Sequence, residues 1–243
     1  MKMRCSKAMQ ELIKGRGRAS ARLFDDFIQS RDLDWADDFW SERDKADFNE
    51  QVRAHLDVWE PKQAELLAAE AAFRAELSAT INEAGRSRGF EAVGIEHPDD
   101  AEAVTIPDSW DDAVILLGPD GIERMLSEWD AVLGADSFPA TRAWMLEHGL
   151  GCRLARDADG NLALAYVFAG KSDDDPRVVW FGYLPRNAQP APEPLPSYWD
   201  DLPDLLRRFK AELHSGFVGG GNADGLTREL EGTPGNWISQ LFD

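Results

Sequence analysis

Two apolar runs joined by an Asp-Gly turn constrain the fold of this chain more than any other feature. Residues 152–156 and 162–168 flank the segment 157–161, which has the sequence Asp-Ala-Asp-Gly-Asn. An Asp-Gly pair between apolar runs is a strong signal for a β-hairpin, because both residue types accept the positive φ of a tight turn. A third apolar run at 177–184 follows the acidic segment 173–176, which predicts a connecting loop and a third strand. The sequence therefore predicts a three-stranded antiparallel meander.

Helical and extended segments are predicted on both sides of the meander. Apolar residues at spacings of three and four predict helices, and short apolar runs bounded by Pro, Asp or Gly predict strands or extended segments. A glycine triplet at 219–221 predicts a flexible loop. The predicted helices span 122–133, 141–148 and 202–214, and the predicted strands or extended segments span 90–95, 103–106 and 113–117.

Residues 23–89 carry a helical pattern. Four apolar residues follow one another at spacings of 4, 4 and 3, which places them on one face of a helix. Pro61 is expected to break or kink this helix, because proline lacks an amide donor and its ring clashes with the preceding turn. The first part of the chain therefore predicts a helical hairpin or layer. The four apolar residues are Phe48, Val52, Leu56 and Trp59.

The first 22 residues differ in charge from the rest of the chain. They contain seven basic residues and one acidic residue, Glu11, so they carry +6 and the remaining residues carry −25. With little apolar periodicity, this segment predicts a flexible or weakly helical tail. A mitochondrial-type targeting peptide, which is also Arg-rich and poor in acids, is the open alternative. The predicted organisation is a basic tail at 1–22, a helical region at 23–89 and an α+β domain at 90–243, which can be continuous with the helices.

Length and composition bound the fold class and the compartment. A chain of 243 residues suits one large domain or two small ones. With the segments above, this predicts an α+β protein: a helical N-terminal part followed by an antiparallel sheet with flanking helices. Two cysteines, Cys5 and Cys152, are too few for a disulfide framework, and no apolar run approaches the length of a membrane span. We expect a soluble, cytoplasmic protein in a reducing compartment.

No motif in the sequence predicts catalysis, a metal site or a cofactor. No two histidines pair at metal-ligand spacing, and a solvated loop is the favoured interpretation of the acidic segment around His97. Cys152 lies in an apolar strand and predicts a buried, inert thiol. The glycine-rich stretch 216–221 lacks the Lys-Ser/Thr of a phosphate-binding loop. We therefore expect binding without catalysis. The four histidines are His55, His97, His148 and His214.

Acidic residues cluster in runs with few basic residues. The formal net charge is −19, from 45 acidic and 26 basic residues. Such a surface repels phosphate backbones, which argues against nucleic acid as an ordinary partner. Ordinary solubility explains any single run, but the sum favours a basic protein partner that relieves the self-repulsion. The predicted partner-binding residues are Asp99, Asp100, Glu102, Asp108, Asp111, Asp112, Asp173, Asp174, Asp175, Asp200 and Asp201, with Trp110 and Trp199 as candidate aromatic anchors. For both tryptophans, a position in the core is the favoured interpretation.

The stretch 198–217 resembles the SUKH superfamily of bacterial toxin-immunity proteins. The recurring element of that family is a Leu-Pro, an apolar helix with a Phe, and an Asn-Gly or His-Asp-Gly turn. Here Leu-Pro stands at 202–203, Phe209 lies in the predicted helix, and the segment 214–216 is similar to the turn, with Ser215 where an Asp is common. In the family this element usually precedes most of the strands, whereas here the β-rich part comes before it.

The resemblance and the charge point to the same function. They imply an immunity protein that binds a cognate, basic bacterial toxin and neutralises it by stoichiometric occlusion. An acidic adaptor or chaperone for a secreted effector is the alternative, and mimicry of nucleic acid is a third interpretation of the same charge. An enzyme is the least favoured class, because no motif supports one.

Overall fold

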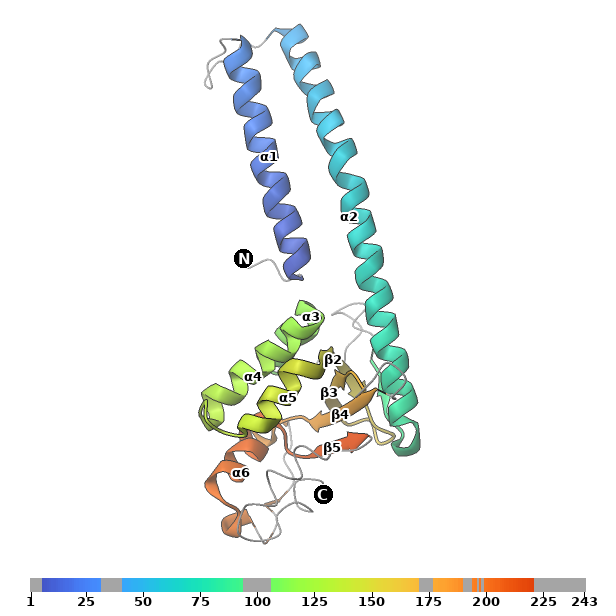
Figure 1. The fold of residues 1–243 in the computed structure, drawn as a ribbon, viewed down its shortest axis with the longest axis vertical. Helices are drawn as coiled ribbons and strands as arrows, with labels where there is room; N and C mark the ends of the chain where they lie inside the picture. Colours follow the sequence, from blue (N-terminus) through green and yellow to red (C-terminus); the bar gives the residue numbers. More distant parts are fainter. Residues whose placement is uncertain are drawn as a thin grey trace. The chain divides into compact units, whose positions relative to one another are not determined.

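The chain divides into two compact units, unit 1 at residues 1–73 and unit 2 at residues 74–243. Helices form the described part of unit 1, and unit 2 combines an antiparallel sheet with helices (Figure 1). The fold is therefore α+β, with long N-terminal helices before the sheet and its flanking helices, as the sequence predicts. The computed structural model describes residues 6–31, 41–93, 106–170, 177–189, 194–195, 197 and 199–220.

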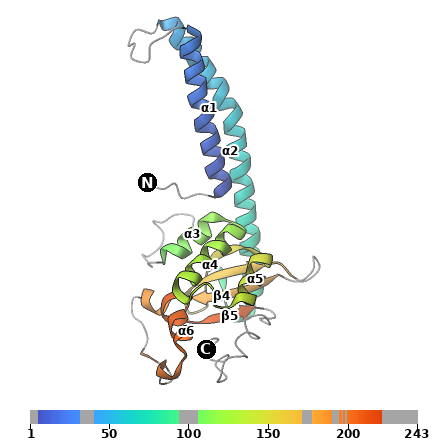
Figure 2. The same ribbon diagram turned by 60° about the vertical axis from the view of Figure 1, so that its left-hand side comes forward.

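Unit 1 is an antiparallel pair of long helices. α1 spans Lys7–Arg31, and α2 spans Glu42–Gly85, so the last turns of α2 belong to unit 2. A serine precedes and caps each helix: the hydroxyl oxygen accepts a hydrogen bond from the amide three residues later, at 3.0 Å for Ser6 and 3.1 Å for Ser41. These side chains satisfy amides that a helix N-terminus leaves unpaired. Figures 1 and 2 show the two helices side by side along α1.

Aromatic rings of both helices hold the hairpin together. The ring centroids of Phe27 and Phe48 lie 5.1 Å apart, where α1 ends and α2 begins. Farther along, the Trp59 ring packs against Gly15, where an added Cβ would lie 3.2 Å from the ring. The apolar stripe predicted for α2 is therefore the face that contacts α1.

The structure corrects two expectations for this region. Residues 7–22, expected as a flexible or weakly helical tail, form a regular part of α1, because contacts with α2 stabilise a helix that the local sequence specifies only weakly. α2 also continues through Pro61 without a break. Contacts on both sides of this proline, from Trp59 to Gly15 and from Glu70 to the Ser6 hydroxyl, hold both halves of the helix against α1.

Within the described residues of unit 2, five strands form one antiparallel sheet, and their order across the sheet is their order in the chain. They span Glu91–Ala92 (β1), Gly149–Arg156 (β2), Leu162–Phe168 (β3), Val178–Tyr183 (β4) and Phe217–Gly220 (β5). The predicted meander is confirmed as β2, β3 and β4, with Tyr166 paired to Cys152 on one side and to Trp180 on the other. The prediction of a flexible loop at 219–221 is wrong for its first two residues, because pairing with β4 makes them part of β5.

Asp157 stabilises the turn between β2 and β3. Its Oδ1 accepts hydrogen bonds from the amides of Asp159 at 3.0 Å and Asn161 at 2.8 Å, and its Oδ2 accepts one from the Tyr183 hydroxyl at 3.1 Å. Partial burial would raise the pKa of Asp157, but hydrogen bonds from these three residues outweigh burial and hold this pKa below its usual value. Gly160 has a φ of +86°, which favours glycine. The Asp-Gly signal therefore reflects both a side-chain acceptor and a backbone requirement.

Helices between the strands complete unit 2, with α3, α4 and α5 between β1 and β2 and α6 between β4 and β5. α4 and α5 confirm the predicted helices at 122–133 and 141–148, and α6 with the turn that follows it confirms most of the prediction at 202–214. The four helices are Asp108–Leu116 (α3), Pro119–Leu133 (α4), Pro139–His148 (α5) and Asp204–Arg208 (α6), and α6 continues as a π-helical turn at Phe209–Leu213.

The expected extended segment at 113–117 is wrong, because this run lies largely in α3. A short apolar run fits either a strand or a buried helix, and only its surroundings decide between them. Trp110, Ala113 and Val114 are all buried, and their spacing places them on one helical face against the core.

The sheet is buried on both faces. On one face, strand residues such as Tyr166 and Trp180 pack into a core with α3 and α4. On the other face lie the last turns of α2 and the residue Phe90, whose ring stacks on Phe181 with centroids 4.0 Å apart (Figure 1). Burial on both sides explains why every residue of β3 is buried and why its sequence is apolar without alternation.

Candidate functional site

The first acidic patch, which we call the α3 patch, consists of Asp108, Asp111 and Asp112 at the beginning of α3. Asp108 is exposed, and the other two are half-buried. Carboxylates in the first turn of a helix are stabilised by the helix dipole, so these acids also support α3. Asp112 forms an ion pair with Arg124, whose Nε lies 3.2 Å from Asp112 Oδ2, and this pair offsets the charge of the Asp112 carboxylate. Asp108 is therefore the acid of this patch with the most accessible charge.

Arg124 links the α3 patch to α4. Besides Asp112, its guanidinium contacts Glu128, with Nη1 and Oε2 3.0 Å apart. Partial burial would lower the pKa of Arg124, but hydrogen bonds to Glu128 and Asp112 outweigh burial and raise it. One cation is thus shared by two carboxylates, and the neighbourhood keeps a net negative charge.

The second acidic patch, which we call the η3 patch, consists of Asp200, Asp201 and Asp204. Asp200 and Asp201 are exposed in a 3₁₀ turn at Trp199–Asp201, directly before α6. Asp204 forms an ion pair with Arg207 on the next turn of the helix. Figures 1 and 2 show α3 and α6 separated, with α4 between them. The predicted partner-binding acids that the structure describes therefore lie in two separate patches on unit 2.

The two predicted aromatic anchors lie in different environments. Trp110 is only 1% exposed and packs in the core, with its ring centroid 5.5 Å from that of His214. It is therefore not available to a partner, and the prediction that it anchors one is wrong. Trp199 is half-buried, and the guanidinium carbon of Arg186 lies 5.6 Å from its ring centroid. Trp199 thus remains a candidate anchor beside Asp200.

Several predicted partner-binding residues lie outside the described residues. The same holds for the acidic loop around His97, which the sequence presented as a weak metal candidate. Within the described part of the chain, no group of three or more His, Cys, Asp and Glu side chains is placed to hold a metal ion. The predicted residues outside the described ranges are Asp99, Asp100, Glu102, Asp173, Asp174 and Asp175.

The turn at 214–216, which resembles the SUKH superfamily, places His214 in the core of unit 2. His214 is 0% exposed, and its Nε2 lies 2.7 Å from the Tyr166 hydroxyl on β3. A Cβ at Gly182 would lie 2.3 Å from His214 Nδ1, so the imidazole requires a glycine on β4. The rings of Trp129 and Phe217 also lie close to the imidazole, with centroids 6.3 Å and 5.3 Å away.

Burial sets the protonation of this cluster. It lowers the pKa of His214 to about 3 and raises the pKa of Tyr166 and of the Cys152 thiol. All three side chains are therefore uncharged near neutral pH. They are also enclosed, with at most 1% exposed, so they do not present a reactive group to a substrate. Sequence analysis identified Cys152 as buried but did not place His214 beside Tyr166.

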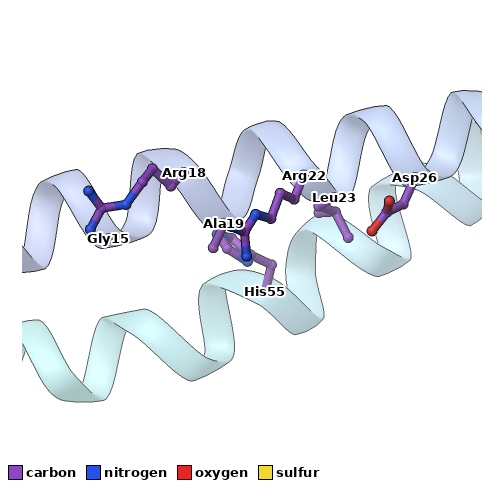
Figure 3. A pocket seen from close by; sticks show the side chains of 7 residues that line it. All are labelled: Gly15, Arg18, Ala19, Arg22, Leu23, Asp26 and His55. Carbon is purple, nitrogen blue, oxygen red and sulfur yellow. The ribbon is translucent and has the colours of Figure 1, made fainter.

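A groove lies on unit 1 between α1 and α2 (Figure 3). Its volume is about 490 Å³, and two of its residues are arginines from successive turns of α1. Sequence analysis did not find this groove, because it exists only where two helices meet and its α2 contributor, His55, is far away in the chain. The lining residues are Gly15, Arg18, Ala19, Arg22, Leu23, Asp26 and His55.

Comparisons with known proteins return no match. No protein-family model matches the chain, and neither a curated protein nor a solved structure is significantly similar to it. In the part of the chain that the structure describes, no helix has both the length and the apolar composition needed to cross a membrane. The function must therefore be argued from the site itself.

Proposed function

We propose that this chain is an immunity protein that binds a basic bacterial toxin in the cytoplasm and neutralises it by stoichiometric occlusion. The observation that carries the proposal is the distribution of charge between the two units. Unit 2 contains 30 acidic and 14 basic residues, whereas unit 1 contains 15 acidic and 12 basic residues. The negative charge is thus concentrated on the unit that also holds the sheet and both acidic patches.

This concentration has a physical cost that a basic partner removes. A net charge of −16 on unit 2 repels itself and weakens the compact state. A complementary surface offsets that repulsion and accelerates the encounter, since opposite fields steer diffusion. Asp108, Asp200 and Asp201 are exposed acids of the two patches and can present this charge to a partner. Trp199, half-buried beside Asp200, supplies apolar contact area.

The resemblance to the SUKH superfamily supports the same role, because it concerns residues that shape the fold. The turn that resembles the family begins at His214 and leads into Phe217 of β5, and both residues are buried in the core. These residues specify how the last strand joins the core, so a resemblance here concerns the fold and leaves the binding surface free to differ. An immunity protein needs this freedom, because each one must fit its own toxin.

The proposed function is binding without catalytic turnover. His214, Tyr166 and Cys152 are the groups whose pKa values burial shifts most clearly, and all three lie inside the core. Burial in the packed core therefore accounts for their shifted pKa values. Occlusion requires only a complementary surface, which the two patches supply.

The alternative is an acidic adaptor or chaperone for a secreted effector, and one observation favours it. The hairpin of unit 1 exposes large apolar side chains on α2, with Val58 53% and Leu67 50% exposed. Exposed apolar side chains on a long helix suit transient contact with unfolded or partly folded cargo. Such a protein would bind many cargoes, whereas an immunity protein binds one.

Co-purification separates these functions. The full chain, tagged and expressed in its source cells, is isolated under mild conditions, and its partners are identified by mass spectrometry. Immunity predicts one basic protein in a one-to-one complex, toxic when expressed alone and harmless with this chain. Recovery of many unrelated unfolded proteins would favour the chaperone. Turnover of a substrate by the purified chain would contradict both binding functions.

A further inference from the structure

We propose that the groove between α1 and α2 binds a small molecule that carries a phosphate group, through Arg18 and Arg22. This site lies on unit 1, away from both acidic patches in sequence, and it does not depend on the proposed function. The proposal rests on the shape of the groove, on the pairing of charges along the hairpin and on a second groove that lacks the same features.

The groove follows one face of α1. Its α1 residues fall at helical spacing, so Arg18 and Arg22 stand one turn apart on the same side. Figure 3 shows the Arg22 side chain extending from α1 towards His55 on α2. The Ser20 hydroxyl lies 2.9 Å from His55 Nε2 and fixes the position of the imidazole. A volume of about 490 Å³ is within the range of roughly 300–1,000 Å³ that small-molecule sites occupy.

Three other cations of the hairpin form ion pairs with carboxylates. Arg31 pairs with Asp44 and Asp47 at 2.7 and 2.6 Å. Lys14 pairs with Glu11 at 2.7 Å, and Lys45 pairs with Glu42 at 2.8 Å. Such pairs are expected in a chain with 45 acidic residues, where carboxylates lie close to many of the cations.

Arg18 and Arg22 depart from this pattern. Among the described residues, neither guanidinium has a hydrogen-bond or ion-pair partner. Asp26 lines the same groove one turn beyond Arg22, yet no ion pair joins the two in the described part of the chain. Two like charges one turn apart repel each other, and an anion between them converts that repulsion into attraction.

Phosphate fits these groups better than a carboxylate does. A guanidinium donates two parallel hydrogen bonds to an oxyanion, and a phosphate monoester offers three oxygens and up to two negative charges. Two arginines can therefore engage one phosphate at the same time. Leu23 and Ala19 give the groove an apolar floor, on which an organic group attached to the phosphate can rest.

A second groove on the hairpin lacks the pair of arginines and therefore serves as a comparison. It has a volume of about 470 Å³ and includes one arginine, Arg53, with the acids Glu50 and Asp57 on neighbouring turns of α2. No ion pair joins Arg53 to either acid in the described part of the chain, but two carboxylates in the groove repel an anion. Arg53 is exposed like Arg18 and Arg22, so it provides a matched control.

Isothermal titration calorimetry on the full chain tests the proposal, with inorganic phosphate and adenosine monophosphate as the two probes. We expect saturable binding of at least one probe to the unaltered protein. The double variant R18Q/R22Q should weaken that binding at least tenfold, and R53Q should leave it unchanged. All three side chains are exposed, and circular dichroism verifies that the helices are intact.

The two probes distinguish the source of the phosphate. Comparable affinity for both assigns the site to phosphate itself, and a preference for the nucleotide assigns it to an organic phosphate ester. Two results would overturn the proposal: neither probe binds at millimolar concentration, or R18Q/R22Q binds as tightly as the unaltered chain. Equal weakening by R53Q would also overturn it, because the effect would then be one of net charge.

Discussion

Acidification should destabilise unit 2 through His214. Burial lowers the pKa of this imidazole from 6.5 to about 3. Between these two values the unfolded chain binds a proton that the folded chain excludes. The free energy of unfolding therefore rises with pH across this window, and stability is lost as the pH falls below 6.5.

The size of the loss follows from the pKa difference. Each pH unit inside the window changes the free energy of unfolding by about 1.4 kcal/mol, so about 2 kcal/mol is lost at pH 5. Tyr166 and Cys152, which lie near the imidazole, have raised pKa values and stay uncharged at acidic pH. Asp157 has a lowered pKa, so its contribution is lost below about pH 4. Among the described groups with a shifted pKa, His214 is therefore the one that changes stability between pH 7 and pH 5.

Urea denaturation at pH 7, 6 and 5, followed by tryptophan fluorescence, measures this loss. The variant His214→Gln keeps an acceptor for the Tyr166 hydroxyl but cannot take up the proton, so it should be less stable at pH 7 and lose little more by pH 5. His148→Gln on α5, which replaces a partly exposed histidine, is the matched control and should keep the full loss. A wild-type stability that does not change between pH 7 and 5, or an equal loss in His214→Gln, would refute the reasoning.

Three further predictions concern packing, the β2–β3 turn and charge. Gly182→Ala should destabilise unit 2 by about 3 kcal/mol in thermal denaturation, because the new Cβ would lie 2.3 Å from His214 Nδ1. The control variant Gly17→Ala places its Cβ in open space on α1 and should raise helix stability by about 0.5–1 kcal/mol. A Gly182→Ala protein as stable as the wild type would contradict the core packing described above. Asp157→Ala should cost about 2 kcal/mol in urea denaturation, because the turn loses three hydrogen bonds to an ionised acceptor. An unchanged midpoint would show that the turn does not need this side chain. Charge reversal to Lys at Asp108, Asp200 and Asp201 should slow association with the basic partner in stopped-flow experiments and reduce its dependence on salt, while the same change at the exposed unit 1 acids Asp25, Glu60 and Glu65 should have a smaller effect. Equal effects of the two triples would mean that only net charge matters.

The parts of the fold that the sequence predicted are those set by local chemistry. The meander was predictable because Asp157 and Gly160 specify the turn and the flanking runs are apolar throughout. The stretch 113–117 was not, because the same apolar run fits a helix or a strand until its neighbours are known. The helix at 7–22 depends on α2, whose contacts lie more than thirty residues away, so the local sequence indicated only a tail.

The candidate sites also divide into features that the sequence predicts and features that depend on tertiary packing. The acids of the two patches are visible in the sequence, since charged residues are exposed with few exceptions. Trp110 was misassigned because burial depends on which side of α3 faces the sheet. The groove beside Arg22 could not be predicted, since the distances between side chains on two helices depend on the register that Gly15 and Trp59 establish. A signal was present in the isolated arginines of α1, but their lack of partners is visible only in three dimensions.

The central claim is that this chain silences one toxin by forming a one-to-one complex. The most direct test titrates the full chain into a fixed amount of the co-purified toxin and measures the remaining toxin activity. The account predicts a linear fall to zero that ends at one equivalent, with activity restored when the complex is dissociated at high salt. Complete inhibition at far less than one equivalent would mean that the chain inactivates its partner catalytically, and full activity at a large excess would mean that it does not neutralise a toxin; either result would contradict the account.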